Sequence, residues 1–416
     1  MRILFVSRFL PYPKVRDSGG QDTYHYIASL VDRGHDVSLI AFVQPEDIPG
    51  VAAMREICDQ VLPVPYQSHA FFPRLWRAFW RLVFTRVYGR VFSFRYLYAL
   101  QSLLRRTHFD VVVVDGVMAL YGRLVSGPAK VLDEVDVYSS VACQIYKNTT
   151  CSLERLYARL DWLRTTDAEL RYARNHDAVL VRSYKDKIIL ENYLPEQVFF
   201  VLSPWFEGLA DLQHIELARP VTNNLLFVGA MKNPSNIEAI LYFVKEVFPL
   251  IQERVGDLQL YIVGNAPPLE VQRLNLIPGI VVTGAVENLT PYYKMCTVNV
   301  VPLLTGGGII VKTLNGLAAG RPTVATAVGN SGTGAVPGRD LLVPASYPHA
   351  FADAVLKLLT DEALWYQIAR QGREFVQKTF DFNAMISDFV DFLLYVSRDE
   401  AYKQDTTKGL LKFRLN

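Results

Sequence analysis

Cysteine is scarce in this sequence, with four residues among 416. They lie at positions 58, 143, 151 and 296, and none belongs to a C-x-x-C pair. Structural zinc sites need closely spaced cysteine or histidine ligands, and small secreted domains are dense in disulfides. Because the scattered cysteines fit neither pattern, we expect the protein to reside in a reducing compartment.

Three further features are missing. No apolar run approaches the roughly 20 residues that a membrane-spanning helix requires. The N-terminus runs directly into a strand-like segment, without the basic, apolar and small-residue order of a signal peptide. The dinucleotide fingerprint G-x-G-x-x-G is also missing, which argues against a dehydrogenase. These absences predict a cytoplasmic protein of another class.

What the sequence does contain is an alternation of short β-rich runs with longer helical patterns. Such an alternation predicts an α/β fold with parallel sheets and helices on both faces. Helices are predicted over 22–33 and 237–255, and from about 351 onward. The predicted strands are 2–7, 36–42, 111–115, 130–133 and 178–182 in the first half, and 225–228, 258–263, 280–283, 298–301, 323–326 and 341–343 in the second.

The chain is too long for one hydrophobic core, so more than one domain is expected. A polar, proline-containing stretch over 203–222 separates the two runs of alternation. We therefore predict an N-terminal Rossmann-like domain over 1–205 and a second one over 206–385. A helical segment over 386–416 follows them.

Glycines cluster where predicted strands end, which is where open parallel sheets bind ligands. Gly19 and Gly20 precede the first predicted helix, whose N-terminal amides favour an anion such as a diphosphate. A stronger pattern is formed by Gly306, Gly307 and Gly308 followed by Lys312, because successive amides and an ammonium can contact the same phosphates. The alternative is that these glycines only form turns and that Lys312 is solvated.

Smaller features point to the same edge of the second sheet. Gly229 and Gly264 each follow a strand and leave room for a ligand, and Lys232 lies in the first of these loops. Gly284 and Val286 begin a loop that can offer backbone groups to a nucleobase. A solvated lysine and a simple turn are the competing interpretations.

These residues resemble the retaining glycosyltransferases of family 4, which have the GT-B fold, and more narrowly the bacterial members that build surface polysaccharides. The resemblance covers nearly the whole chain and is most specific between about 225 and 376. The segments that carry it are 227–229, 234–236, 260–264, 282–284, 301–303, 306–308, Lys312, 319–322 and 340–343, with 19–20 and 34–37 in the first half.

The resemblance implies two Rossmann-like domains that face each other across a cleft, with the last helices crossing back to the N-terminal domain. The nucleotide diphosphate sugar donor would bind mainly to the second domain, and a glycan or lipid-linked glycan acceptor to the first. No metal and no cofactor are expected, because basic side chains and backbone amides would neutralise the leaving diphosphate.

Three positions depart from the family pattern. Asn315 stands where a glutamate usually holds the nucleotide ribose, and Ile310 and Ala230 stand where arginines are common. Asn315 can still form hydrogen bonds, but it carries no charge. An unusual nucleotide, for example one with a deoxyribose, and a weakened enzyme are both compatible with these departures.

Acidic residues follow the fourth predicted strand, where many relatives place a histidine near the acceptor. Asp133, Glu134 and Asp136 are the candidates for orienting or deprotonating an acceptor hydroxyl, and Asp136 is our catalytic choice. A solvated acidic loop is the alternative.

A basic and aromatic stretch runs from 69 to 109, with eight arginines and no Asp, Glu or Lys. Such a stretch suits the surface of an anionic membrane, where rings lie at the interface and arginines meet phosphates. Core packing of the rings, or a nucleic-acid surface without a recognisable module, are the alternatives. We predict peripheral contact with the cytoplasmic face of the inner membrane, and no nucleic-acid partner. The predicted contact residues are Arg74, Trp76, Arg77, Trp80 and Arg81.

The sequence therefore predicts a metal-independent, hexosyltransferase-like glycosyltransferase of bacterial surface polysaccharide, including lipopolysaccharide, synthesis. Two alternatives stay open. One is an epimerase of the same fold that releases its sugar to water. The other is a catalytically silent GT-B protein that binds a glycan or assists an active transferase. The donor sugar, nucleotide base, linkage and oligomeric state are not predicted.

Overall fold

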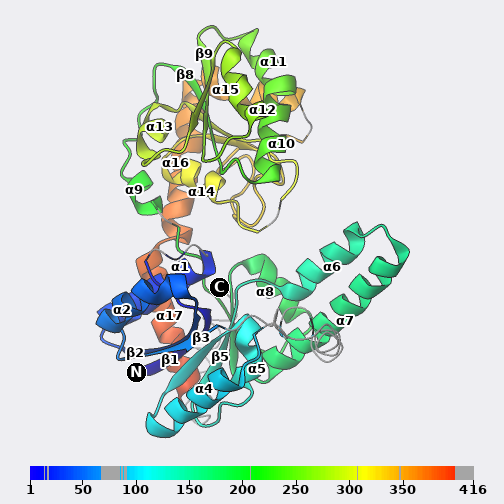
Figure 1. Cartoon of the computed structure of the whole chain (residues 1–416). Helices are drawn as coiled ribbons and strands as arrows, with labels where there is room; N and C mark the ends of the chain where they lie inside the picture. Colours follow the sequence, from blue (N-terminus) through cyan, green and yellow to red (C-terminus); the bar gives the residue numbers. More distant parts are fainter. Residues whose placement is uncertain are drawn as a thin grey trace. The chain divides into compact units, whose positions relative to one another are not determined.

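The computed structural model describes residues 1–13, 15, 18–66, 85, 88, 91–206, 208–306, 308–345 and 348–398. The chain divides into two compact units (Figure 1). Unit 1 consists of Met1–Trp205 together with Phe382–Asn416, and unit 2 consists of Phe206–Asp381. Among the described residues, no helix is long and apolar enough to span a bilayer.

Unit 1 is built on a seven-stranded parallel sheet. Its order is β3-β2-β1-β4-β5-β6-β7, so the chain reverses direction across the sheet between β1 and β4. All five strands predicted in the first half are present, because their apolar runs are buried on both faces. The strands are β1 (Arg2–Phe9), β2 (Asp36–Val43), β3 (Gln60–Pro65), β4 (Val111–Asp115), β5 (Ala129–Glu134), β6 (Ala178–Val181) and β7 (Phe199–Val201).

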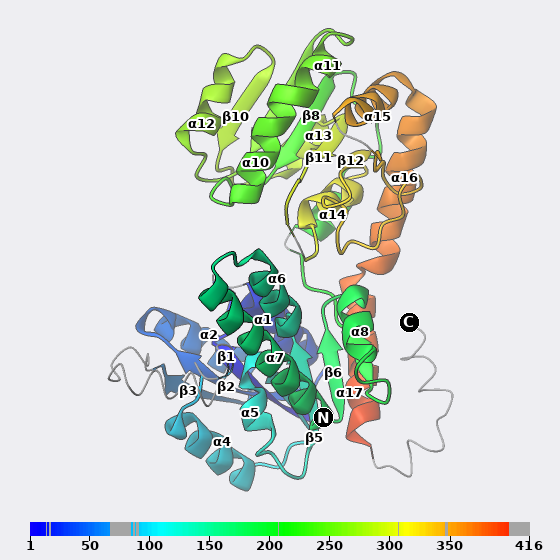
Figure 2. The same cartoon turned by 90° about the vertical axis from the view of Figure 1, so that its right-hand side faces the viewer.

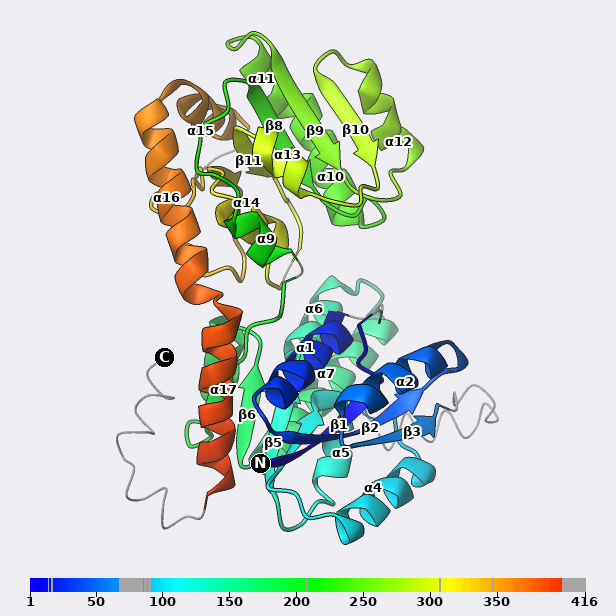
Figure 3. The same ribbon diagram turned by 90° about the vertical axis from the view of Figure 1, so that its left-hand side faces the viewer.

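Helices cover both faces of this sheet, and α6 and α7 form a hairpin (Figure 2). The final helix, α17 (Phe382–Ser397), packs on unit 1 against α1 (Figure 3). It buries Ile386, Phe389 and Phe392 in the same core as β1 and β4. The other helices are α1 (Ser18–Asp32), η1 (Pro45–Asp47), α2 (Ile48–Ile57), α4 (Phe94–Arg106), η4 (Gly116–Met118), α5 (Ala119–Gly122), α6 (Tyr138–Asn148), α7 (Ser152–Arg174) and α8 (Tyr184–Glu191).

Unit 2 is built on a five-stranded parallel sheet of order β10-β9-β8-β11-β12. Its strands are β8 (Asn223–Val228), β9 (Leu258–Val263), β10 (Ile280–Gly284), β11 (Val298–Val301) and β12 (Thr323–Ala325). The sixth predicted strand, 341–343, is wrong as a strand, because the segment forms only isolated bridges at Leu341 and Leu342.

The helices of unit 2 include one correction. The single helix predicted over 237–255 is interrupted by a π-helical turn, η5 (Phe243–Val247). Pro249 lies just after this turn and has no amide to donate to the preceding helical turn. The helices are α9 (Leu209–Gln213), α10 (Pro234–Tyr242), α11 (Phe248–Gln252), α12 (Leu269–Gln272), η6 (Arg273–Leu276), α13 (Thr290–Met295), α14 (Val311–Ala318), α15 (His349–Thr360) and α16 (Glu362–Thr379).

Candidate functional site

The strongest candidate site in unit 2 surrounds the ammonium of Lys312, in the first turn of α14. The ammonium donates a hydrogen bond to the side-chain oxygen of Asn236 in α10. It also lies 4.6 Å from the ring centre of Phe227 in β8. Asn236 is held in turn, because its amide donates to the carbonyl of Ala230 at 2.9 Å. Three elements therefore position one cation at the carboxyl end of β8.

Gly229 makes this arrangement possible. A Cβ atom on Gly229 would lie 2.9 Å from the Lys312 Nζ and 2.9 Å from the Asn236 Nδ2. Any side chain here would force the ammonium or the Asn236 amide to move. The structure thus brings together Gly229 and Lys312, as a ligand site at this sheet edge requires. It adds Asn236, for which the sequence predicted no role.

The charge of Lys312 has no acidic partner within the part of the chain that the structure describes, where it forms no ion pair. Burial lowers the pKa of Lys312 to about 8. This drop from 10.5 corresponds to about 3 kcal/mol of disfavoured charge. A buried cation without a counter-charge attracts an anion, and such perturbed groups cluster at functional sites.

The loop before α14 contains the predicted glycines. Gly306 and Gly308 have φ of 147° and 71°, which side-chain-bearing residues rarely adopt, and Gly307 lies outside the described residues. The loop is anchored on α10, since the Thr305 hydroxyl donates to the carboxylate of Glu238 at 2.8 Å. The helix α14 has no side-chain cap at its N-terminus. The amide of Thr313 donates to the carbonyl of Ile310, whereas those of Val311 and Lys312 are positioned to meet an anion.

Asn315 faces the protein interior. It is buried, and its side chain lies against the hydroxyl of Tyr293 in α13. The Asn315 side-chain oxygen has no hydrogen-bond partner within the described chain. An unsatisfied buried acceptor of this kind is costly.

The other residues predicted to bind the nucleotide sugar lie along the same sheet edge or on the surface beside it. Gly284 ends β10, and its carbonyl accepts from the Gly264 amide at 3.1 Å. Val286 is half-buried in the loop that follows, and Lys232 is exposed. The role of these residues in ligand binding stays a prediction.

In unit 1, Gly19 and Gly20 do not lie in a loop. The helix α1 begins at Ser18, so the prediction that it starts at 22 is wrong, and both glycines lie in its first turn. The anion site expected at this end stays a prediction.

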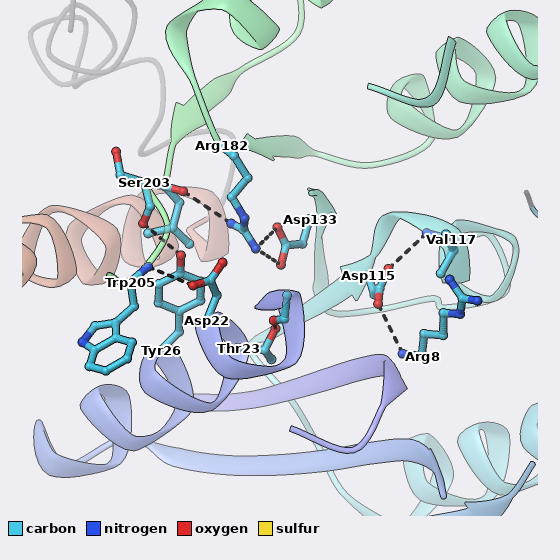
Figure 4. Close-up of polar contacts among 12 residues, drawn as sticks. Arg8, Asp22, Thr23, Tyr26, Asp115, Val117, Asp133, Arg182, Ser203 and Trp205 are labelled. Carbon is cyan, nitrogen blue, oxygen red and sulfur yellow. Dashed lines mark hydrogen bonds and ion pairs between the residues drawn. The ribbon is translucent and has the colours of Figure 1, made fainter. Parts of the chain in front are cut away.

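Charged side chains gather at the carboxyl ends of β4, β5 and β6. Arg182, directly after β6, contacts both carboxylate oxygens of Asp133 at 3.0 Å, and both side chains are buried (Figure 4). The guanidinium also lies 5.3 Å from the ring centre of Tyr26. Burial raises the pKa of Asp133, and Arg182 opposes that rise. This pair connects the sheet to α1.

A second acidic pair lies beside it. Glu134 and Glu169 are almost fully buried, and the Glu169 carboxylate accepts from the Ser139 hydroxyl. No donor within the described chain reaches either oxygen of Glu134. Burial, followed by the charge of Glu169, raises the pKa of Glu134 well above its usual value. Burial together with Asp133 also raises the pKa of Asp115 to about 6. These carboxyls therefore hold protons at higher pH than ordinary ones.

The predicted acidic segment thus separates into distinct environments. Asp133 is used in an ion pair, Glu134 is buried against Glu169, and Asp136 is exposed just before α6. Sequence reasoning missed Arg182 and Glu169. The signal for Arg182 was a charged residue placed directly after an apolar strand. The predicted membrane residues Arg74, Trp76, Arg77, Trp80 and Arg81 lie outside the described residues.

Comparison with known proteins identifies a family for part of the chain. Residues 222–361, about a third of the chain, match the family described as Glycosyl transferases group 1. This segment contains Gly229, Asn236 and Lys312. The chain also has the GT-B fold, since its two parallel α/β sheets match structures of GT-B glycosyltransferases.

Three of those structures illustrate the match. Sucrose-phosphate synthase from Thermosynechococcus elongatus is 17% identical with a TM-score of 0.62, over 94% of this chain and 98% of that one. HepE from Anabaena, in complex with UDP, is 13% identical with a TM-score of 0.61, over 94% and 99%. WaaG, a glycosyltransferase involved in lipopolysaccharide biosynthesis, is 16% identical with a TM-score of 0.56, over 94% and 99%. At these identities the likeness shows the fold alone.

One relative is similar in sequence over part of its length. It is described as an uncharacterized 44.6 kDa protein in the cps region of Klebsiella pneumoniae, and it is 25% identical over 173 residues. The matched segment spans 39% of this chain and 44% of that relative.

Proposed function

We propose that this protein is a glycosyltransferase that moves a sugar from a nucleotide diphosphate sugar to a glycan or lipid-linked glycan acceptor. The observation that carries this proposal is the buried ammonium of Lys312, uncompensated within the described chain, beside Gly229 at the carboxyl end of β8. A diphosphate supplies the missing negative charge. The family match covers this same segment.

The chemistry assigned to unit 2 is stabilisation of a leaving diphosphate. As the bond to the sugar breaks, negative charge develops on the phosphate oxygens, and Lys312 together with the first amides of α14 would stabilise it. Retention of configuration and independence from metal are parts of the proposal. Asp136, exposed before α6, is our candidate for orienting the acceptor in unit 1.

The biological setting we propose is surface polysaccharide synthesis on the cytoplasmic side of the membrane. The cps-region relative and the lipopolysaccharide context of WaaG support it. HepE was crystallised with UDP, which supports a nucleoside diphosphate as the ligand class.

The experiment that tests the proposal is a thermal-shift screen of the purified chain against UDP, GDP, dTDP, ADP and CMP without divalent metal. A ligand that binds only the native state raises the melting temperature. A shift with one diphosphate would support a transferase and identify the nucleotide. A uniform lack of shift would overturn the proposal.

Replacing Lys312 by alanine is expected to weaken nucleoside diphosphate binding about 10- to 100-fold, because a charge-assisted hydrogen bond is worth about 1.5–3 kcal/mol.

Since the pKa of Lys312 is about 8, binding at pH 8 should take up about half a proton. Affinity should therefore fall as the pH rises above 8. Titration calorimetry in buffers of different ionisation enthalpy measures this uptake.

The matched control is Lys245→Ala, which removes an exposed lysine from the same unit and should change neither affinity nor proton uptake. Lys312→Arg should retain binding but lose the pH dependence, because a guanidinium stays charged. Proton uptake that persists in Lys312→Ala would exclude Lys312 as the linked group.

Peripheral membrane contact is the last part of the proposal. Within the described residues, α4 exposes Phe94 and Tyr98, each by 76%, on a helix that also carries the exposed Arg95, Arg105 and Arg106. Replacing Phe94 and Tyr98 by serine should reduce co-sedimentation with phosphatidylglycerol vesicles several-fold. The exposed Tyr193→Ser is the control. Unchanged co-sedimentation would remove α4 from the contact.

A second candidate function is a silent GT-B binding protein. It is favoured by Asn315, which lies against Tyr293, and by the uncharged Ile310 and Ala230. Such a protein would bind a glycan and leave all five nucleotides of the thermal-shift screen unbound. A shift with any diphosphate would exclude this candidate.

A further inference from the structure

A basic cavity in unit 1 has no role in the proposed chemistry. It has a volume of about 310 Å³, within the range typical of small-molecule sites, and it lies beside α5 and α7. Among the described residues, its charged lining consists of the guanidiniums of Arg123, Arg164 and Arg171 and the carboxylate of Asp167. Asp167 pairs with Arg171, and the described part of the lining contains three guanidiniums and one carboxylate.

The arginines come from two separate elements. Arg164 and Arg171 are seven residues apart, which is about two turns, so they lie on the same face of α7. Arg123 immediately follows α5, where its amide caps that helix. Convergence from two elements distinguishes this set from a solvated helix face. Arg159 is exposed on α7, as are Arg164 and Arg171, but it does not line the cavity.

Tyrosines form the inner wall of the cavity. The rings of Tyr88 and Tyr172 meet edge to face, with 4.7 Å between their centres. Burial raises the pKa of Tyr172, whereas Arg123 and Arg171 lower it, which places two of the guanidiniums near its hydroxyl. A tyrosine hydroxyl between two guanidiniums can join them in binding one anion.

Two buried acids lie behind this wall. Glu134 and Glu169 lie close enough to Tyr88 to act on its pKa. Burial raises the pKa of both carboxyls, and the charge of Glu169 raises the pKa of Glu134 further, whereas a hydrogen bond with Glu134 lowers the pKa of Glu169.

We propose that this cavity binds a phosphate or diphosphate group carried by the acceptor. Guanidiniums present planar pairs of donors that match phosphate oxygens, and several of them together suit a polyanionic group better than a neutral sugar. The assignment of the anion to an acceptor rests on the proposed function, whereas the anion site itself does not.

The test is calorimetric titration of the full chain with inorganic pyrophosphate at about 0.15 M ionic strength. All proteins carry Lys312→Ala, which weakens the candidate nucleotide site equally in every variant. Arg164→Gln/Arg171→Gln is expected to lower the affinity at least tenfold. Arg155→Gln/Arg159→Gln, which removes the same charge from exposed positions of the same helix, is expected to change it less than twofold.

Equal affinity in the two double variants would overturn the proposal, provided that both melt at the same temperature. Flotation with phosphatidylcholine vesicles that contain a long-chain prenyl diphosphate then separates the sources of the group. Arginine-dependent flotation identifies a lipid diphosphate, and arginine-dependent binding of a soluble phosphorylated oligosaccharide identifies a glycan phosphate. The protein could bind pyrophosphate through these arginines and yet bind no nucleotide. That result would support the anion site in the cavity and contradict the proposed transferase function.

Discussion

Replacing Gly264 by alanine is expected to lower the free energy of unfolding of unit 2 by more than about 4 kcal/mol. A Cβ atom on Gly264 would lie 1.8 Å from the carbonyl oxygen of Gly229, far inside van der Waals contact. Neither atom can move away cheaply. The Gly229 amide donates to Val263 at 2.9 Å, and the Gly264 amide donates to Gly284 at 3.1 Å. Relief of the clash therefore requires breaking these hydrogen bonds between the ends of β8, β9 and β10.

The matched control for this prediction is Gly256→Ala. Gly256 has open space around the position of a Cβ, so its replacement should change stability by less than about 1 kcal/mol. Hydrogen exchange read by mass spectrometry assigns the loss to a unit, and we expect faster exchange confined to β8, β9 and β10. A Gly264→Ala protein with native exchange and native stability would show that the two strand ends are not in fixed contact.

Replacing Asp133 by asparagine is expected to destabilise unit 1 by about 3–5 kcal/mol, because it leaves the Arg182 guanidinium buried without its main counter-charge. Arg182 lies 3.0 Å from the Asp133 carboxylate, with side-chain exposures of only 6% and 7%. Chemical denaturation followed by circular dichroism measures the change. The double replacement Asp133→Leu/Arg182→Met should restore most of the stability, since it removes both charges.

The control for burial is a second ion pair of the same length. Arg254 and Asp353 in unit 2 are also separated by 3.0 Å, but their side chains are 65% and 56% exposed. Solvent screens an exposed pair, so Asp353→Asn should cost less than about 1 kcal/mol. Equal losses at Asp133 and Asp353 would mean that burial is not what makes the first pair matter.

The strands were predictable where the chain is apolar on both faces of a sheet. The strand β3 was missed because Pro63 and Pro65 argue against a strand. These prolines are tolerated because β3 lies at the edge of the sheet. The π-helical turn before Pro249 was missed because the apolar periodicity of 237–255 continues across it. Both misses arise where backbone hydrogen bonding, rather than side-chain pattern, decides the structure.

Single residues of the candidate site could be predicted from the sequence, but their contacts with one another could not. Gly229 and Lys312 were recognisable from glycines and a lysine near strand ends, but nothing in their spacing shows that they meet at Asn236. The same holds for Arg182 and Glu169, whose partners Asp133 and Glu134 come from a different part of the chain. A sequence pattern records neighbours along the chain, whereas these pairs are made by the order of strands in the sheet.

The position of α17 has a consequence for the way the protein is made. Residues of this helix complete the hydrophobic core of unit 1, yet the ribosome synthesises them only after the whole of unit 2. At about 5–20 residues per second, the first unit waits on the order of ten seconds or more for its last helix. During that time the apolar surface around β1 and α1 is exposed to chaperones. Unit 2, which is contiguous in sequence, can finish folding before the unit that began first.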